Sequence, residues 1–421
     1  MKELHYDTAV IGGGAAGMAA ALELDAAGFS VAIIERDAFL GGVLMQCIHN
    51  GFGLHAFGEE LTGPEFAERF IEKTLQSRIT CYLHTTVLSL RLEGSPHTGA
   101  PEKELYCVSS QGVIHIHART VMLAMGCRER NRGNVRIPGF RPAGVYTAGL
   151  AQRLVNIEGY IPGKEVVIIG SGDIGLIMAR RMSWVGCTVK AVVEIMPYPA
   201  GLTRNIVQCL QDFHIPLYLS SQTTRIFGHD RVEGVEVCPV ENGVLIPEKR
   251  FSLACDTVLL SVGLVPENEL SREAGVELYG ATGGPLVDAS LMTNLEGVFA
   301  CGNVLHVHDL VDWVTEEGKR AGAYTASWLT GARFPVQIRV KAGSNVRYVN
   351  PGKLNPQRDN RVYLRSLMVK NDAVLEVRMA MRVIKTLKLG HIQPSEMIHL
   401  SIGSKDLEGC TPDSVLEFAL S

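Results

Sequence analysis

The stretch "YDTAVIGGGAAGMAAALELDAAGFSVAIIER", residues 6–36, decides the fold class of this chain. A short apolar strand leads into the pattern Gly12-x-Gly14-x-x-Gly17, and an alanine-rich helix and a second strand follow. Gly12 permits a tight turn, Gly14 lets the backbone approach a pyrophosphate, and Gly17 lets the helix lie close to the sheet. Glu35, at the end of the second strand, can accept hydrogen bonds from ribose hydroxyls. The stretch predicts a dinucleotide site at the amino end of a helix.

A second stretch, "KEVVIIGSGDIGLIMARRMSWVGCTVKAVVEI", residues 164–195, repeats this design. Its second strand ends in Glu194, which would bind a free ribose 2′-hydroxyl and repel a 2′-phosphate. The residues after it, "IMPYPAG", contain no Arg or Lys to receive such a phosphate, so NAD is favoured over NADP. The expected contacts of this nucleotide are Gly170, Gly172, Asp173, Ile174, Gly175 and Glu194, with Gly263 from a later strand.

Two dinucleotide sites in one chain are explained most economically by one bound flavin and one nicotinamide nucleotide that exchanges with solution. The alternative is a pair of nicotinamide domains that arose by duplication. Later segments of the chain, described below, favour the flavin.

The composition is that of an ordinary globular enzyme, with 46% hydrophobic and 20% charged residues. The formal net charge of −4 provides no basic field, which argues against nucleic acid and anionic membranes as partners. The first residues lack the build of a signal peptide, and no apolar run is long enough to span a membrane. We therefore expect a cytoplasmic protein.

The ten cysteines are scattered, and no two form a C-x-x-C pair. This spacing argues against a zinc ribbon and against a cysteine-ligated iron–sulfur cluster. Scattered cysteines suit a reducing compartment. The sequence thus predicts no metal site.

Three later segments, read together with the two glycine patterns, resemble the two-dinucleotide-binding flavoprotein oxidoreductases, which include thioredoxin and glutathione reductases. They are "TVMLAMGCRERNRGNVRIPG" (120–139), "DTVLLSVGLVPENEL" (256–270) and "LEGVFACGNVLHVHDLVDWVTEEGKRAGAYTASWL" (295–329). The resemblance runs from residue 6 to about residue 330. It implies an α/β fold in which two Rossmann-like domains bind FAD and NAD(H), and an FAD-dependent NAD(H) oxidoreductase activity.

The resemblance also implies how the domains are arranged. The FAD-binding domain would comprise residues 1–147 and 263–332, split by an NAD-binding domain at 148–262. Residues 333–421 alternate apolar and polar side chains between Gly, Pro, Asn and Asp, which predicts a small C-terminal β-rich domain. Within it, "AVLEVRMAMRVIKTLKLG" also suits a helix. This domain is either a stabilising lid or a docking module for a partner subunit.

The FAD contacts of the family carry over to matching positions of this sequence. One departure is Asn303, where the family usually has Asp; an amide can still accept and donate hydrogen bonds there. A helix from about residue 310 would point its positive amino end at the flavin pyrimidine ring. The implied contacts are Gly12, Gly14, Gly17, Glu35, Arg36, Gly41, Gly42, Ala124, Gly126, Gly302, Asn303 and Val314.

The segment "GGVLMQCIHNGFG", residues 41–53, lacks the redox cysteine pair that disulfide reductases carry beside the flavin. At the positions of that cysteine pair this sequence has Leu44 and His49, with Cys47 between them. The thioredoxin reductase arrangement would need C-x-x-C in the NAD domain, where only Cys255 is found near the expected place. We therefore exclude a disulfide reductase.

Together with "CGNVLHVHDLVDW", residues 301–313, this segment resembles a narrower group. These are the FAD- and NAD-binding subunits found with glycerol-3-phosphate dehydrogenase, opine oxidase and hydrogen cyanide synthase. The resemblance implies the electron-transfer subunit of a multi-subunit dehydrogenase that oxidises a small substrate such as glycerol 3-phosphate. Its partners would be a substrate-oxidising flavoprotein subunit, joined by an iron–sulfur subunit where a cluster is present. The alternatives are a self-contained NADH oxidase that reduces O2 through the flavin, and a scaffold that binds both nucleotides without turnover.

The candidate catalytic residues are Cys47, His49 and His306, expected on the flavin face opposite the nicotinamide. Cys47 is either a thiolate near the flavin or an inert buried thiol. His49 is either a proton donor or acceptor near flavin N5 or a structural histidine. His306, His308 and Asp309 resemble a metal ligand cluster by type, but no further carboxylate or cysteine is fixed nearby in the sequence. These residues are expected to line the flavin cavity or a partner surface.

Overall fold

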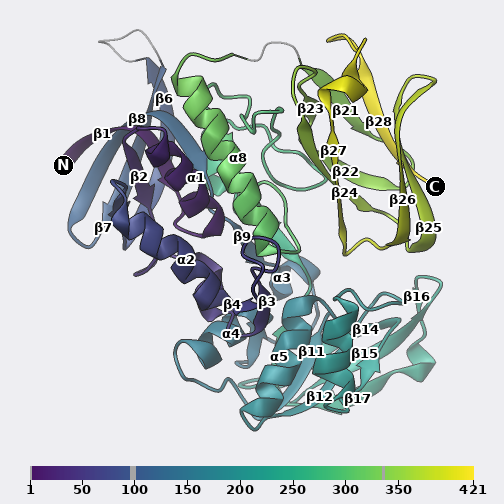
Figure 1. Ribbon diagram of the computed structural model, residues 1–421. Helices are drawn as coiled ribbons and strands as arrows, with labels where there is room; N and C mark the ends of the chain where they lie inside the picture. Colours follow the sequence, from purple (N-terminus) through teal and green to yellow (C-terminus); the bar gives the residue numbers. More distant parts are fainter. Residues whose placement is uncertain (1, 95–100, 334–336) are drawn as a thin grey trace. The chain divides into compact units, whose positions relative to one another are not determined.

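A computed structural model describes residues 2–94, 101–333 and 337–421 (Figure 1). The chain divides into two compact units. Unit 1 comprises Met1–Met45, Asn50–Cys127 and Pro266–Ser421, and unit 2 comprises Gln46–His49 and Arg128–Val265. The three domain boundaries expected from the sequence, at 147/148, 262/263 and 332/333, remain a prediction.

Unit 1 is built on a seven-stranded sheet in the order β5-β2-β1-β8-β7-β6, with β20 paired to β8. The strands β5, β2, β1, β8 and β20 run parallel, and β2 and β20 are buried along their whole length, as expected for a sheet covered on both faces. β6, β7 and β8 form an antiparallel layer. The strand bounds are β1 Lys2–Ile11, β2 Val31–Ile34, β5 Thr80–Tyr82, β6 Thr85–Gly94, β7 Pro101–Ser109, β8 Gly112–Leu123 and β20 Val298–Ala300.

Helices α1 (Ala15–Ala26) and α8 (Val311–Leu329) lie side by side in unit 1 (Figure 1). Glycines of α8 permit this close approach. A Cβ atom at Gly318 would lie 2.4 Å from the Ala16 carbonyl oxygen, and one at Gly322 would lie 2.5 Å from that of Ala20. The remaining elements of this part are η1 Gly42–Gln46, β3 Asn50–Phe52, β4 Leu61–Thr62, α2 Gly63–Gln76, α7 Glu269–Glu273 and η4 Gly302–Val304.

The C-terminal part of unit 1 consists of two sheets, one in the order β23-β21-β28-β25-β26 and one in the order β22-β24-β27. The stretch that also suited a helix forms the hairpin β25–β26, so the helical alternative was wrong. In β25, Ala373, Leu375 and Val377 alternate with more exposed residues and enter the core, which fixes the strand. The bounds are β21 Ile338–Ala342, β22 Val346–Asn350, β23 Lys353–Leu354, β24 Asn360–Ser366, β25 Lys370–Met379, β26 Arg382–Ile392, β27 Met397–Ile402, η5 Ser404–Leu407 and β28 Val415–Leu420.

Unit 2 contains a five-stranded parallel sheet in the order β10-β18-β11-β12-β13 and a four-stranded antiparallel sheet in which β15 pairs with β14, β16 and β17. Its elements are α3 Arg132–Val135, β10 Val145–Thr147, α4 Ala148–Asn156, β11 Glu165–Ile169, α5 Asp173–Trp184, β12 Thr188–Val193, α6 Thr203–Ile206, η2 Val207–Gln211, β13 Leu217–Tyr218, β14 Ser221–Phe227, β15 Gly234–Glu241, β16 Val244–Leu245, η3 Pro247–Lys249, β17 Phe251–Ala254 and β18 Thr257–Leu260. Two connecting strands are β9 Cys127–Glu129 and β19 Leu264–Pro266. Among the helices described, none combines the length and apolar character that a membrane crossing requires.

Candidate active site

The first glycine turn of unit 1 leaves an open space at the start of α1. Gly12 has φ +106°, and a Cβ atom there would lie 2.5 Å from the Ala124 carbonyl oxygen. A Cβ atom at Gly17 would lie 1.9 Å from the Gly12 carbonyl oxygen, whereas one at Gly14 would meet no atom within 4 Å. Because Gly14 caps α1 without a side-chain hydrogen bond, the first amides of the helix can receive a phosphate. This cradle fits the pyrophosphate of FAD.

The buried Glu35 carboxylate is fixed beside this turn by two backbone amides. It accepts from Gly13 N at 2.7 Å and from Asp37 N at 2.8 Å. Arg36, next to it, is exposed. A carboxylate has about four acceptor positions, so Glu35 retains capacity for ribose hydroxyls.

The second pair of glycines approaches the first turn. Gly41 N donates to Gly13 O at 2.9 Å, and a Cβ atom at Gly42 would lie 3.3 Å from Gly14 Cα. Both glycines have positive φ angles, 105° and 57°. The structure therefore brings the predicted FAD residues of the two segments together around one turn.

Asn303 uses both ends of its amide. Its Oδ1 accepts from His308 N at 3.0 Å, and its Nδ2 donates to Cys127 Sγ at 3.7 Å. An ionised aspartate could not donate to the sulfur atom, which gives a physical reason for the departure from the family pattern. Gly126, which precedes Cys127, has φ +71°, and its carbonyl oxygen accepts from Glu267 N at 3.0 Å.

The amino end of α8 begins at Leu310, which provides no side-chain cap. In its first turn, the buried Asp312 accepts from His55 N at 3.1 Å and from Ala56 N at 2.8 Å. Asp312 thus fixes the segment that follows β3 against the helix. Val314, a predicted FAD contact, lies half-buried in the next positions of α8.

His306 and His308, in the segment before α8, form a buried cluster with Glu317 of α8. Glu317 Oε1 is 3.0 Å from His306 Nε2, and Glu317 Oε2 is 3.2 Å from His308 Nε2. Glu317 Oε2 also accepts from Gly302 N at 2.7 Å. The sequence places Asp309 next to these histidines, but in the structure both histidines contact Glu317 of α8 instead. The two contacts have hydrogen-bond lengths and hold the pair without an ion.

The cluster is polarised in one direction. Burial alone would raise the pKa of Glu317, but His308 and His306 together hold it well below its ordinary value. Burial, reinforced by His308, lowers the pKa of His306 to about 4 although Glu317 opposes that shift. At neutral pH Glu317 is therefore an ionised carboxylate, and His306 is a neutral imidazole that donates to it.

The C-terminal sheets close over this cluster. The Tyr363 ring lies 5.3 Å from both histidine rings, and its hydroxyl accepts from Arg320 at 3.2 Å. Arg365 donates to Val307 O at 3.0 Å and forms an ion pair with Asp309. Burial raises the pKa of Tyr363 to about 12, so it stays a neutral phenol.

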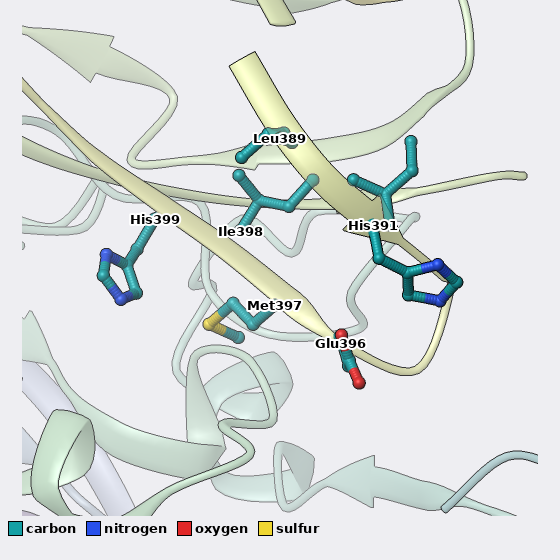
Figure 2. Close-up of a pocket in the computed structure, with 7 residues that line it drawn as sticks. Leu389, His391, Glu396, Met397, Ile398 and His399 are labelled. Atoms are coloured by element: carbon teal, nitrogen blue, oxygen red, sulfur yellow. The ribbon is translucent and has the colours of Figure 1, made fainter. Parts of the chain in front are cut away.

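A hollow of about 230 Å³ lies at the edge of the same sheets, between β26 and β27 (Figure 2). Met397 donates its backbone amide to Asp309 at 2.5 Å, and the His399 ring lies 4.5 Å from Trp313 of α8. The hollow therefore adjoins the loop of the histidine cluster. Its lining residues are Leu389, His391, Ile392, Glu396, Met397, Ile398 and His399.

Cys47 and His49 belong to unit 2, whereas His306 belongs to unit 1, so the structure does not bring the three candidate catalytic residues together within one unit. Cys47 is 5% exposed, with Sγ 3.7 Å from Gln152 Oε1, and burial raises the pKa of its thiol to about 12. Burial, with Arg180 and Arg204, lowers the pKa of His49 to about 4. At neutral pH Cys47 is a thiol and His49 is a neutral imidazole.

The second glycine turn, in unit 2, is packed against Ser261. A Cβ atom at Gly170 would lie 2.1 Å from the Ser261 carbonyl oxygen, and one at Gly175 would lie 2.6 Å from Ser261 Cβ. Ser261 Oγ also accepts from Gly175 N at 3.0 Å. Gly172 caps α5 without a side-chain bond, so this helix end fits a second pyrophosphate. Ser261 was missed in the sequence because it follows the glycine turn by many residues.

Glu194 is buried at the end of β12 and holds the loop. It accepts from Ser171 N at 2.8 Å, from Ser171 Oγ at 2.6 Å and from Met196 N at 2.9 Å. Asp173 accepts from Leu202 N at 2.8 Å and thereby fixes the loop after Glu194. Ile174 is half-buried in α5, and Gly263, with φ +99°, accepts from Arg130 N at 2.9 Å.

A family model described as pyridine nucleotide-disulphide oxidoreductase matches residues 6–327. The chain belongs to this family. Members of this family use FAD and NAD(P)H, and the chain has the α/β, two-Rossmann-domain fold that the sequence predicted. All ten cysteines lie in the described residues, and none of them forms a disulfide there.

Relatives of this chain include an opine oxidase subunit of Agrobacterium tumefaciens (strain Ach5), 26% identical over 71% of this chain and 61% of that protein. Thioredoxin reductase of Ureaplasma parvum is 24% identical over 78% of this chain and 99% of that protein. The chain spans about three fifths of the length of the opine oxidase subunits. The crystal structure of T. acidophilum thioredoxin reductase covers 78% of this chain and 99% of its own, with 23% identity and a TM-score of 0.63, and shows the same fold.

Proposed function

We propose that this oxidoreductase exchanges hydride between NAD(H) and FAD as the electron-transfer subunit of a multi-subunit dehydrogenase. The companion subunit would be a flavoprotein that oxidises a small substrate such as glycerol 3-phosphate, and any iron–sulfur cluster would lie on another subunit. The similarity to the opine oxidase subunits supports this assignment.

The state of the cysteines carries the proposal. None of the ten forms a disulfide, and the buried Cys47, in the segment expected beside the flavin, has a thiol pKa raised to about 12. A thiol with this pKa is neither a nucleophile nor a ready reductant at neutral pH. Electrons would therefore leave the flavin for an acceptor other than a cysteine pair of this chain, and the similarity to the opine oxidase subunits favours a companion subunit over O2.

The two glycine turns and their acids would hold the nucleotides. When bound, FAD supplies the two-electron chemistry. Gly12, Gly14 and Gly17 would receive its pyrophosphate, and Glu35 its ribose. Gly170, Gly172 and Gly175 would receive the pyrophosphate of NAD(H), and Glu194 would bind the free 2′-hydroxyl of its ribose.

His306 and Glu317 would act as positioning residues. Glu317 fixes the Gly302 amide at the turn before α8 and fixes His306 through the same carboxylate. The other ring nitrogen of the neutral His306, Nδ1, would be only a weak proton acceptor, because the pKa of His306 lies near 4. His49, also neutral, would accept a proton only weakly, because its pKa lies near 4.

The purified chain tests the proposal by anaerobic titration with NADH, followed by exposure to oxygen. We expect the flavin absorbance to bleach with one NADH and to recover slowly in air, and an added companion subunit or an artificial acceptor to accelerate the recovery. Rapid oxygen turnover that disappears in Cys47→Ser would instead identify a self-contained NADH oxidase. An unbleached flavin would identify a binding scaffold.

A further inference from the structure

We propose that one face of the antiparallel layer of unit 1 binds a divalent transition-metal ion of the zinc class through Glu104, His115 and His117. His5 and Glu102 complete the rim of this site. The ligand atoms of Glu104, His115 and His117 lie within 4.8 Å of one another, and so do those of His5, Glu102 and His117. Nothing in the nucleotide-binding turns contributes to it.

The strand register places these side chains on one face. Glu104 of β7 pairs with His117 of β8, and His117 pairs on its other side with His5 of β1. Paired residues of neighbouring strands project to the same face, and so do residues two positions apart, which adds His115. Three strands thus converge on one imidazole, that of His117.

The distances within the group match the spacing of metal ligands rather than that of hydrogen bonds. His115 Nε2 lies 3.4 Å from Glu104 Oε2, and His117 Nδ1 lies 3.9 Å from Glu104 Oε1 and 3.7 Å from Glu102 Oε2. Ligand atoms bound at about 2.1 Å to a tetrahedral zinc ion lie about 3.4 Å apart. Normal N–H···O bonds span about 2.7–3.2 Å. The buried His306–Glu317 cluster has contacts of 3.0 and 3.2 Å and is closed by hydrogen bonds.

Three buried imidazole nitrogens of this group lack a hydrogen-bond partner within the described residues. His115 is 6% exposed, and both of its ring nitrogens are buried without such a partner; the same holds for His117 Nδ1. Buried polar atoms are nearly always satisfied, so these nitrogens require a ligand. One metal ion can bind one nitrogen of each ring, His115 Nε2 and His117 Nδ1, because imidazole nitrogens and a carboxylate oxygen are zinc donors.

The group is also ordered and open to solvent on one side. The His115 ring is stacked on Tyr106 at 4.3 Å, and the His117 ring is stacked on His5 at 4.7 Å. The His5 side chain is 68% exposed, which gives an ion access from solvent. Two histidines and one carboxylate leave a fourth position for water or for His5.

Calorimetric titration of the chelator-treated, flavin-containing protein with Zn²⁺ tests this proposal. We expect one ion per chain, and a dissociation constant raised by more than about a hundredfold in His117→Ala and Glu104→Gln, because loss of a ligand exceeds the effect of losing a supporting hydrogen bond. His229→Ala, which changes an exposed histidine of unit 2, is the matched control and should bind as the wild type does. Co²⁺ should give tetrahedral d–d bands at wavelengths longer than the flavin absorbs.

The unfolding temperature gives a second measurement of zinc binding. Zn²⁺ should raise the unfolding temperature of the wild type and of His229→Ala, but not that of Glu104→Gln. Glu104→Gln keeps the size of the side chain and the strand pairing, so it tests the proposal even if His117→Ala fails to fold. A wild-type protein that retains no zinc overturns the proposal, and so does zinc binding that is unchanged in Glu104→Gln.

Discussion

Glu317 and His306 form a hydrogen-bonded pair of 3.0 Å in which neither side chain is more than 1% exposed. The carboxylate is ionised, and it also accepts from Gly302 N and His308 Nε2. A buried charge with three donors is stabilised only while all of them are present. The pair therefore couples the turn before α8 to the loop that the C-terminal sheets cover.

Glu317→Gln is expected to destabilise the protein by about 3 kcal/mol, because an amide cannot accept from all three donors. Urea unfolding followed by circular dichroism measures the change. Glu316→Gln is the matched control, because Glu316 is the neighbouring residue of α8 and is partly exposed. Its Oε1 lies 3.9 Å from the Nε atoms of Arg320 and Arg361, so the change should alter the free energy of unfolding by less than about 1 kcal/mol. Equal effects of the two changes would contradict the role assigned to Glu317.

The Glu317 contacts show what the sequence could not provide. The glycine turns were predictable because each is local, and Gly12 and Gly170 adopt positive φ angles that favour glycine. The alternation of residues 333–421 predicted a β-rich domain, but it left the stretch that forms β25 and β26 open between strand and helix. Glu317 reaches His306 only because α8 folds back over the turn, and Ser261 reaches Gly175 only through the parallel sheet. Likewise, the five residues of the proposed metal site come from three strands, and no local motif contains them.

Gly14→Ala is expected to lower FAD content without unfolding the chain. The added methyl group would meet no protein atom within 4 Å and would occupy the space where the pyrophosphate approaches. The ratio of flavin to protein absorbance measures the loss, which we expect to be at least about tenfold in affinity. Gly390→Ala, in β26, also places its methyl group in open space and is the control, with unchanged flavin content. Full flavin occupancy in Gly14→Ala would mean that the cradle holds something else.

His49 is expected to make the protein less stable as the pH falls from 6.5 to 4. Its folded-state pKa is lowered to about 4 from an ordinary 6.5, so the unfolded chain binds the proton first. Stability is complete above pH 6.5 and is lost through this window, by at most about 3 kcal/mol. Denaturant midpoints measured across it should slope less steeply in His49→Gln than in the wild type. His229→Gln should keep the wild-type slope, because that side chain is exposed.

Cys47→Ser is expected to leave flavin reduction by NADH unchanged, since a thiol with a pKa near 12 takes no part in it. Stopped-flow reduction of wild type and variant should give rates within about twofold. Iodoacetamide labelling followed by peptide mass mapping provides a second test, because the buried Cys47 thiol should react more slowly at pH 8 than cysteine in solution. Rapid labelling of Cys47 would contradict this expectation and would favour a thiolate near the flavin.

Glu194 is expected to set the preference for NADH over NADPH. Its carboxylate is fixed by Ser171 and Met196 at the end of β12, where it would bind a free 2′-hydroxyl and repel a 2′-phosphate. Glu194→Gln keeps the size of the side chain and removes the charge, so the ratio of kcat/KM for NADH over NADPH should fall by about tenfold. Glu165→Gln, at the opposite end of the same sheet and paired with Lys190, should leave that ratio unchanged. If the ratio does not change in Glu194→Gln, other side chains near this site select the nucleotide. Arg204 of α6 would then be the first residue to substitute.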